Sequence, residues 1–390
     1  MRTPKLGSKS APRLSVDVLI VGSGITGALV AYELTKAGAT VAITDSRRPA
    51  TGSTPASTAL LQYEIDTPLR TLTQRLGKKH ADAAYLASLG ALAELQTLGR
   101  ELGNSIDLVS RRSLHLAVKP SDVRTFRGEV ASRSKLGIPV SLLSRVQLRS
   151  RFGIDRPGAI LSERALEVNP LKLTFQLLQA AKSRGAVVLP RNRVDLSSLV
   201  EKARPFQIAL RSGTRVTAKH VVIAAGYETP EEFGEIAKLT ELRSTFALAT
   251  MPVRTNLWPE HVLLWDAGDP YFYARTTADR RILVGGEDEP YSTASARDAR
   301  IVAKSRILME TLRQLFPKLK PRIAFRWAGT FAQTKDGLPY IGQHHQWPGV
   351  HFALGYGGNG ITFSLIAARI IAASAAGRTH PSAKLFRFDR

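Results

Sequence analysis

Cysteine is absent from this 390-residue sequence. Without a thiol the chain forms no disulfide, thiolate metal site, iron–sulfur cluster or cysteine nucleophile. The same absence excludes a cofactor attached through a cysteine sulfur. A cytoplasmic location is the simplest expectation for such a chain.

Long apolar runs are also missing. The most apolar stretch, residues 361–377, contains Arg369 and is shorter than the roughly 20 apolar residues that span a bilayer. The apolar run at residues 16–21 has only the length of a strand. We therefore expect neither a signal peptide nor a transmembrane segment.

Acidic residues are few relative to basic ones: 32 Asp and Glu against 55 Lys and Arg leave a formal charge of +23. Such an excess attracts nucleic acid or an anionic membrane surface. The basic residues are dispersed along the chain without an aromatic-interleaved RNA-binding motif. We interpret the excess as a surface property that could steer an anionic substrate or an acidic electron-transfer partner. The eight histidines show no HxH or HExxH spacing, and we predict no metal site.

The composition, 44% hydrophobic and 22% charged, is that of a soluble globular protein, and the length corresponds to two or three domains. Near its start the chain carries a complete βαβ pattern. An apolar strand at residues 16–21 leads into Gly22-Ser-Gly-Ile-Thr-Gly27, a helical pattern runs up to Gly38, and a strand at residues 40–44 precedes Asp45. In G-x-G-x-x-G the glycines allow the tight turn, the approach of a pyrophosphate and close helix packing, and the acid accepts hydrogen bonds from a ribose. We predict a dinucleotide site, the alternative being an ordinary glycine-rich turn.

A second glycine-rich segment, Gly355-Tyr-Gly-Gly-Asn-Gly-Ile-Thr362, lies near the other end of the sequence. Its glycines let the backbone lie against a planar ring, and a helix expected from about residue 361 directs its positive N-terminus there. The alternative is a glycine-rich loop of no function.

Three segments together resemble one family. Residues 220–226 (H-V-V-I-A-A-G), 327–342 (beginning Trp-Ala-Gly) and 355–362 are similar to signatures of the D-amino-acid oxidase/glycine oxidase/sarcosine oxidase superfamily of FAD-dependent oxidoreductases, in that family's order. The motifs are most similar to those of amine-oxidising members such as γ-glutamylputrescine oxidoreductases. The resemblance implies an α/β fold, with a Rossmann-type FAD-binding domain interleaved with an α+β substrate domain built on an antiparallel sheet. It also implies non-covalent FAD.

On this resemblance we expect a basic tail at residues 1–15, an FAD-binding domain of residues 16–84, 157–227 and 328–390, and a substrate domain of residues 85–156 and 228–327. The small-residue stretch 51–61 is expected to wrap the ribityl chain and ring, although its composition alone suggests a flexible linker. The expected cofactor-binding residues are Gly22, Ser23, Gly24, Ile25, Thr26, Gly27, Asp45, Ser46, Arg47, Ser53, Thr54, Ser57, Thr58, Ala59, Leu60, Val194, Ala225, Gly226, Gly355, Tyr356, Gly357, Gly358, Asn359, Gly360, Ile361 and Thr362.

The substrate pocket is expected on the strand around residues 271–275, where alternation places Tyr271, Tyr273 and Arg275 on one face. A surface face of an antiparallel sheet is the alternative. The arginines that bind a substrate carboxylate in glycine oxidase-like and D-amino-acid oxidase-like members are missing, since Phe331 and Gly358 stand there. We therefore favour an amine or an amino-acid derivative, with Arg275 as the cation for any carboxylate. The pocket candidates are Tyr271, Tyr273, Arg275, Phe331, Gln333 and Tyr356, with no obligate base.

The resemblance implies oxidation of a C–N bond: a hydride leaves the α-carbon of an uncharged amine for flavin N5, and water hydrolyses the imine. Oxygen or an electron-transfer partner could be the acceptor. Two alternatives stay open. The protein could act on the side chain of a modified tRNA base, or it could be a non-catalytic basic dinucleotide-fold protein that binds nucleic acid or a membrane. An NAD-dependent dehydrogenase would leave the C-terminal motifs unexplained.

Overall fold

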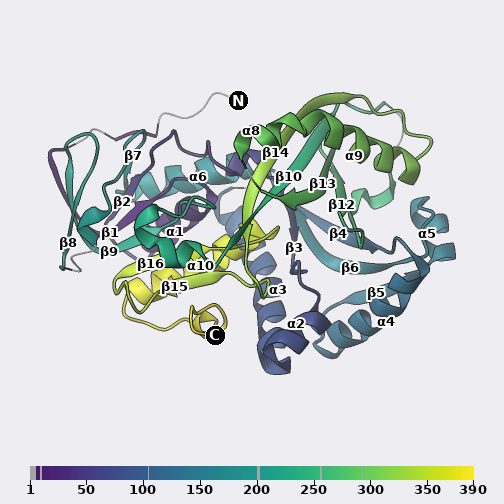
Figure 1. Ribbon diagram of the computed structural model, residues 1–390, viewed down its shortest axis with the longest axis horizontal. Coiled ribbons are helices and arrows are strands. Elements are labelled where there is room, and N and C mark those ends of the chain that lie inside the picture. Colours follow the sequence, from purple (N-terminus) through teal and green to yellow (C-terminus); the bar gives the residue numbers. More distant parts are fainter. Residues whose placement is uncertain (1–5, 9–10, 104, 200–202, 255–256, 292) are drawn as a thin grey trace.

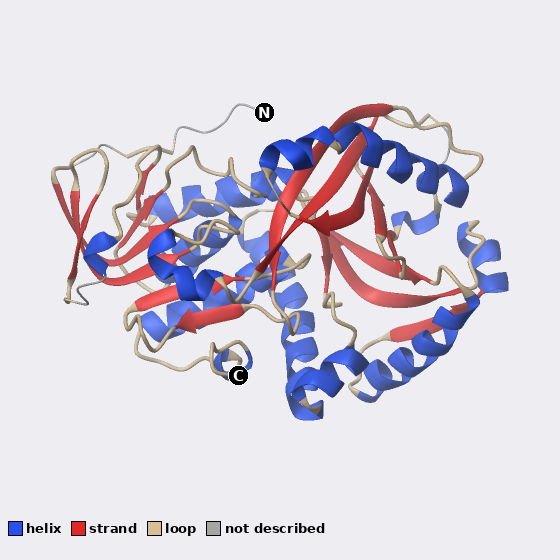
Figure 2. Ribbon diagram, viewed as in Figure 1, coloured by secondary structure: helices blue, strands red, loops and turns tan. Residues whose placement is uncertain are grey.

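Two β-sheets lie beside each other in the computed structural model, which describes residues 6–8, 11–103, 105–199, 203–254, 257–291 and 293–390 (Figure 1). One sheet has seven strands and the other nine. Helices cover both sheets, as Figure 2 shows. The predicted α/β fold class is confirmed. Within the described ranges, no helix is long and apolar enough to cross a membrane.

The seven-stranded sheet is mostly parallel. β1 lies at its centre between β2 and β9, and runs parallel to both. β16 is parallel to β9, and β15 is antiparallel to β16 at the edge. The strands are β1 (Arg13–Val21), β2 (Val41–Thr44), β7 (Val187–Leu189), β8 (Phe206–Ala209), β9 (Arg215–Ile223), β15 (Tyr340–Gln343) and β16 (Val350–Leu354).

Both faces of this sheet are apolar because both are covered. Val18 and Ile20 of β1 pack with α1 (Ile25–Lys36), α6 (Pro170–Ser183) and α10 (Gly360–Ala375). Leu19 points to the other face, where it joins a core with Phe233 and Phe352. The glycine motif therefore leads from a buried strand directly into a buried helix.

The helix predicted to run up to Gly38 is confirmed. α1 ends before Gly38, whose φ of 85° stops the helix. The Asn169 side chain accepts a hydrogen bond from Lys172 N at 3.1 Å and caps α6, with Pro170 at the first helical position. The motif at residues 220–226 begins on a strand and continues past its end: β9 ends at Ile223, and Ala224 N then donates to Val21 O at 2.9 Å.

The nine-stranded sheet carries the second core. Its order is β14-β10-β13-β12-β11-β4-β6-β3, with β5 paired to β6. Leu308 and Leu312 of α9 (Ile301–Leu315) pack with Phe246 of β10 on one face. The strands are β3 (Leu60–Gln62), β4 (Val109–Leu116), β5 (Val140–Ser144), β6 (Gly158–Glu167), β10 (Glu241–Thr250), β11 (Leu263–Asp266), β12 (Phe272–Thr276), β13 (Ile282–Pro290) and β14 (Ile323–Gln333).

The remaining helices surround the sheets: α2 (Leu69–Leu76), α3 (Lys78–Glu101), α4 (Pro120–Lys135), α5 (Arg145–Phe152), α7 (Gly234–Ala237) and α8 (Ala294–Ala299). Sheet membership does not follow the domain ranges expected from the sequence. β3, β6 and much of β14 fall in ranges assigned to the FAD-binding domain but belong to the nine-stranded sheet. The predicted domain ranges stay a prediction.

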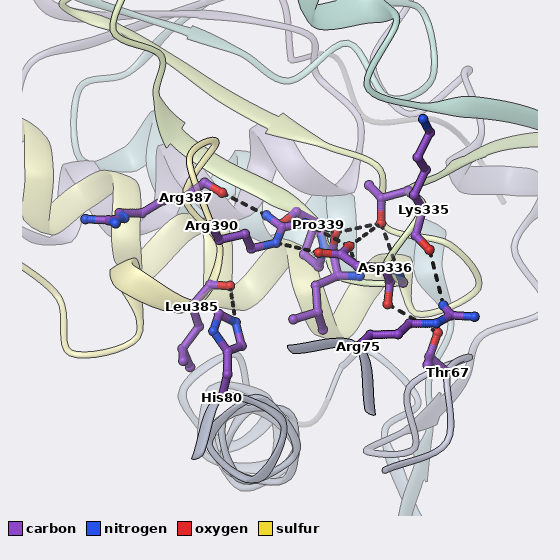
Figure 3. A network of polar contacts seen from close by, with 12 residues as sticks. Thr67, Arg75, His80, Lys335, Asp336, Pro339, Leu385, Arg387 and Arg390 are labelled. Atoms are coloured by element: carbon purple, nitrogen blue, oxygen red, sulfur yellow. Dashed lines mark hydrogen bonds and ion pairs between the residues drawn. The ribbon is translucent and has the colours of Figure 1, made fainter. Parts of the chain in front are cut away.

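The turn between β14 and β15 is tied to the last residues of the chain (Figure 3). Arg390 Nε and Nη2 donate to the two carboxylate oxygens of Asp336 at 2.8 and 3.0 Å. The guanidinium also lies 4.0 Å from the centre of the Tyr340 ring. From α2, Arg75 donates to Lys335 O at 3.2 Å. These contacts fix the turn that follows the strand bearing Phe331.

Candidate functional site

The glycine motif forms a tight turn between β1 and α1. Gly22 has a φ of 112°, and a Cβ there would overlap Ala224 O of the segment after β9. A Cβ on Gly27 would overlap Gly22 O. Neither position admits another residue without backbone movement. The N-terminus of α1 therefore faces a space bounded by backbone, which is the arrangement that accepts an anion.

Asp45, directly after β2, closes this turn. Its Oδ2 accepts hydrogen bonds from Ser23 N at 2.8 Å and Ser23 Oγ at 2.7 Å, and its Oδ1 accepts one from Arg47 N at 2.8 Å. A carboxylate has about four acceptor sites, so capacity remains for a ribose hydroxyl. The sequence correctly predicted that Asp45 directly follows the second strand. Its hydrogen bonding to a ribose stays a prediction.

A cavity of about 740 Å³ begins at this turn and extends past the segment after β9 to β14 and the C-terminal glycine loop. Many of the predicted residues line it. From the cofactor set these are Gly22, Gly24, Ile25, Thr26, Asp45, Ser46, Arg47, Ser53, Thr54, Ser57, Val194, Ala225, Gly226, Gly355, Tyr356, Gly357, Gly360 and Ile361, and from the substrate set Phe331 and Tyr356.

The other predicted residues, all described in the structure, lie outside this lining. Two of them connect the C-terminal glycine loop to the segment around β3: Thr362 Oγ1 donates to Gln62 O at 3.4 Å, and Asn359 Nδ2 donates to Glu64 O at 2.8 Å. Those outside the lining are Ser23, Gly27, Thr58, Ala59, Leu60, Gly358, Asn359, Thr362, Tyr271, Tyr273, Arg275 and Gln333.

One wall was not predicted from the sequence. Asn192 and Arg193 follow β7, and residues 227–230 and Glu232 follow β9. Across the cavity, Arg47 Nη1 and Nη2 donate to the two carboxylate oxygens of Glu228 at 3.1 and 2.8 Å. No local sequence motif predicts these residues. They reach the cavity only because β7 pairs with β2 and β9 pairs with β1 in the sheet.

The C-terminal glycine loop lines the same cavity. Gly357 N donates to Ala332 O at 3.0 Å, and Gly358 N donates to Asp66 Oδ2 at 2.6 Å. Among the described residues, the buried Tyr356 Oη has no hydrogen-bond partner. Burial raises the pKa of Tyr356, which keeps the phenol protonated. The hydroxyls of Thr26 and Ser364 lie near this phenol and oppose the rise in its pKa, so they are the protein groups closest to satisfying it.

The substrate-side strand behaves as alternation predicts. Phe272 and Ala274 are in the core, and Tyr271 and Tyr273 lie together on the other face with ring centres 5.9 Å apart. Burial raises the pKa of Tyr273 to about 12, and it also raises the pKa of Tyr271 well above its usual value.

Arg275 shares this face but is held by protein partners. It is buried, and its Nε donates to Thr58 O at 2.5 Å. Its Nη1 donates to Thr276 O and lies 3.7 Å from Glu167 Oε2. The expectation that Arg275 grips a substrate carboxylate is not supported by this geometry. The side chain instead ties β12 to the small-residue stretch 51–61.

Two carboxylates near the tyrosine pair were missed from the sequence. Asp288 of β13 has one buried oxygen, Oδ1, without a hydrogen-bond partner among the described residues. Burial raises the pKa of Asp288 to about 6, nearby Thr245 and Tyr271 hydroxyls oppose that shift, and Asp66 adds to it. Part of the Asp66 side chain is exposed to solvent. Desolvation of its carboxyl raises the pKa of Asp66, and the hydrogen bond from Gly358 N–H opposes this rise. We call Tyr271, Tyr273, Asp66 and Asp288 the acidic–aromatic cluster.

These features define a class of protein: a dinucleotide-binding α/β protein whose cavity is lined by a pyrophosphate-type turn and by a C-terminal glycine loop. The residues fit FAD, because the N-terminus of α1, Asp45 and the C-terminal glycine loop line one cavity. The chain belongs to the family of FAD-dependent oxidoreductases, whose model matches residues 17–374. It is therefore an enzyme of that family.

Relatives agree with this assignment. The chain is 26% identical to γ-glutamylputrescine oxidoreductase of Escherichia coli over 368 residues, which cover 92% of this chain and 83% of the relative. It is 25% identical to glycine oxidase of Geobacillus kaustophilus, with 91% of this chain and 92% of the relative covered. The crystal structure of glycine oxidase from Geobacillus kaustophilus superposes with a TM-score of 0.78 at 21% identity, covering 97% of this chain and 99% of that chain.

Proposed function

We propose that this enzyme oxidises the C–N bond of a small amine, or of an amino-acid derivative that presents an amine, rather than an α-amino acid gripped by its carboxylate. The observation that carries this choice is the acidic–aromatic cluster. Two carboxylates and two tyrosines stand near the glycine loop, and Arg275 on the same face is held by Thr58 and Glu167. Such a surface attracts an ammonium group and repels a carboxylate.

The chain's own residues explain how a cofactor would be held. Asp45 would accept from the ribose, and the N-terminus of α1 would face the pyrophosphate. Tyr356 and the glycine loop would bound the ring. FAD, when bound, supplies the two-electron acceptor for C–N oxidation.

We infer that Asp288 handles the proton of the substrate amine. An amine must lose its ammonium proton before its α-carbon can release a hydride. Ionised Asp288 would first pair with the ammonium group, and Oδ1, which lacks a protein partner, would then hold the proton. The hydroxyls of Tyr271 and Thr245 favour the ionised form of this carboxyl, because they lower its pKa against the effect of burial.

Steady-state kinetics of Asp288→Asn test the proposal. With putrescine-like amines as substrates, we expect KM to rise by at least tenfold with the bound flavin content unchanged, because the ammonium partner is lost. Asp279→Asn is the matched control, since Asp279 is an exposed carboxylate that pairs with Arg281. The proposal is wrong if Asp288→Asn leaves amine kinetics unaltered, or if glycine or an unmodified D-amino acid is turned over better than every amine tried. Turnover of a modified tRNA alone would support the tRNA alternative instead.

A further inference from the structure

A buried arginine outside the cavity is connected to the stretch of chain that carries Asp66. Arg133 lies on α4, and its side chain is only 1% exposed. Because a guanidinium stays protonated in proteins, burying it requires partners for its charge. The contacts of Arg133 lead to residues 63–70, which connect β3 to the start of α2. α2 and α4 lie next to each other in the lower half of Figure 1.

Arg133 contacts the first part of this stretch directly. Its Nη1 lies 3.5 Å from Glu64 Oε1 and donates to Tyr63 Oη at 3.4 Å. The Glu64 carboxylate also accepts hydrogen bonds from Ser113 Oγ of β4 at 3.3 Å and from Ser162 Oγ of β6. Burial raises the pKa of Glu64, and the charge of Arg133 opposes that rise. Glu64 is therefore held between α4 and the nine-stranded sheet.

Arg133 reaches the last part of the same stretch through Glu129, which also lies on α4. Arg133 Nε donates to Glu129 Oε1 at 3.0 Å. The Glu129 carboxylate accepts hydrogen bonds from Leu69 N at 2.7 Å and from Arg70 N at 3.2 Å, where α2 begins. Asp66 therefore lies between two points of the chain that one guanidinium holds.

The other side of this stretch holds the C-terminal glycine loop. Glu64 O accepts a hydrogen bond from Asn359 Nδ2 at 2.8 Å, and Asp66 Oδ2 accepts one from Gly358 N at 2.6 Å. A Cβ on Gly357 would overlap the Asp66 carboxylate, so this close fit requires glycine there. The position of the loop therefore depends on the stretch that Arg133 holds.

We propose that Arg133 is a positioning residue, which holds Asp66 against Gly358 and so fixes the glycine loop, although Arg133 itself does not line the cavity. Its effect on amine binding rests on the proposed function, in which Asp66 belongs to the surface that attracts the ammonium group. A buried ion pair adds little net stability compared with apolar side chains, but it can select one arrangement of its partners. Without the guanidinium, Glu64 and Glu129 would be buried carboxylates of like charge, and residues 63–70 would shift to relieve this.

Hydrogen exchange of the FAD-loaded enzyme, resolved to single amides, tests this role without any substrate. The Gly358 amide reports its hydrogen bond to Asp66. In Arg133→Met we expect this amide to exchange at least about tenfold faster, as for the loss of a hydrogen bond to a charged group, with FAD content unchanged. The double variant Glu64→Gln, Arg133→Met removes one charge of each sign and should give the same result if the single variant does not fold.

Steady-state kinetics with an amine substrate test whether Arg133 acts through Asp66. Arg133→Met should raise KM by about fivefold or more, with a smaller change in kcat, because the ammonium partner is displaced. Adding Arg133→Met to Asp66→Asn should change KM little beyond the effect of Asp66→Asn alone, since the two residues form one chain of contacts.

The matched control is Phe126→Leu, which removes buried apolar volume from the same helix and leaves Arg133 with its partners. It should lower the urea midpoint without changing KM or the exchange of the Gly358 amide. The proposal is overturned if folded Arg133 variants leave that exchange rate unchanged, or if the control accelerates it as much. Full additivity of Arg133→Met and Asp66→Asn in KM would also overturn it. Absence of turnover with every amine would instead overturn the proposed function, because the exchange measurement requires no substrate.

Discussion

Replacing Asp288 by asparagine should make the protein more stable while making it a poorer enzyme. Burial raises the pKa of this carboxyl from 3.8 to about 6. The folded state therefore binds the proton more tightly than the unfolded state does. The stability associated with that proton is complete below about pH 4 and is lost as the pH rises through about 6.

The magnitude follows from the shift. A change of one pKa unit corresponds to about 1.4 kcal/mol, so holding Asp288 ionised at neutral pH costs about 3 kcal/mol. Asparagine is neutral at every pH and avoids this cost, although it loses part of the stabilisation from Thr245 and Tyr271. We expect Asp288→Asn to gain about 2 kcal/mol of unfolding free energy above about pH 7 and almost nothing near pH 4.

Urea unfolding of both proteins over this pH range is the assay, with the FAD-free and FAD-loaded forms measured separately. Asp17→Asn serves as the control of opposite sign. Its carboxyl pairs with Lys219, and that hydrogen bond together with Thr40 lowers the pKa to about 2. This variant should lose stability above about pH 4. If Asp288→Asn is less stable at neutral pH, or if its advantage does not vary with pH, Asp288 is not a buried carboxylate held ionised for function.

Three further changes have defined outcomes. Gly27→Ala should reduce both FAD content and stability, by about 2 kcal/mol or more, because the methyl group would overlap Gly22 O; retention of full FAD content in the purified variant would contradict the turn geometry. Asp45→Ala should weaken FAD binding by about tenfold with a smaller change in turnover of the saturated enzyme, measured by flavin release in fluorescence titrations. Arg390→Ala should lower the unfolding free energy by about 2–4 kcal/mol, because it leaves the partly buried Asp336 without its bidentate partner. An unchanged urea midpoint would contradict a stabilising role for the Arg390–Asp336 pair shown in Figure 3.

The sequence was sufficient for the parts of the site that depend on local backbone. The glycine turn, α1, β2 and Asp45 form one contiguous unit, so a motif and its spacing predict the structure. The C-terminal glycine loop is similarly local, because α10 begins within it. Strand alternation also separated Phe272 and Ala274 from the tyrosine face correctly.

The sequence was insufficient where function depends on contacts between remote elements. Asp288 becomes a neighbour of Tyr271 through the pairing of β12 with β13, and no motif marks that register. From the sequence alone, Arg275 is an available cation. In the folded chain it contacts Thr58 and Glu167, which come from two other parts of the sequence.

Anaerobic titration of the purified wild-type enzyme tests the central claim most directly. The visible band of bound oxidised flavin is followed while a putrescine-like amine or glycine is added in the absence of oxygen. We expect the amine to bleach the band, with one equivalent reducing one flavin, and glycine to leave it unchanged at the same concentration. Purified protein without a flavin band, or a band bleached by glycine and by no amine, would contradict the assignment of this site to amine oxidation.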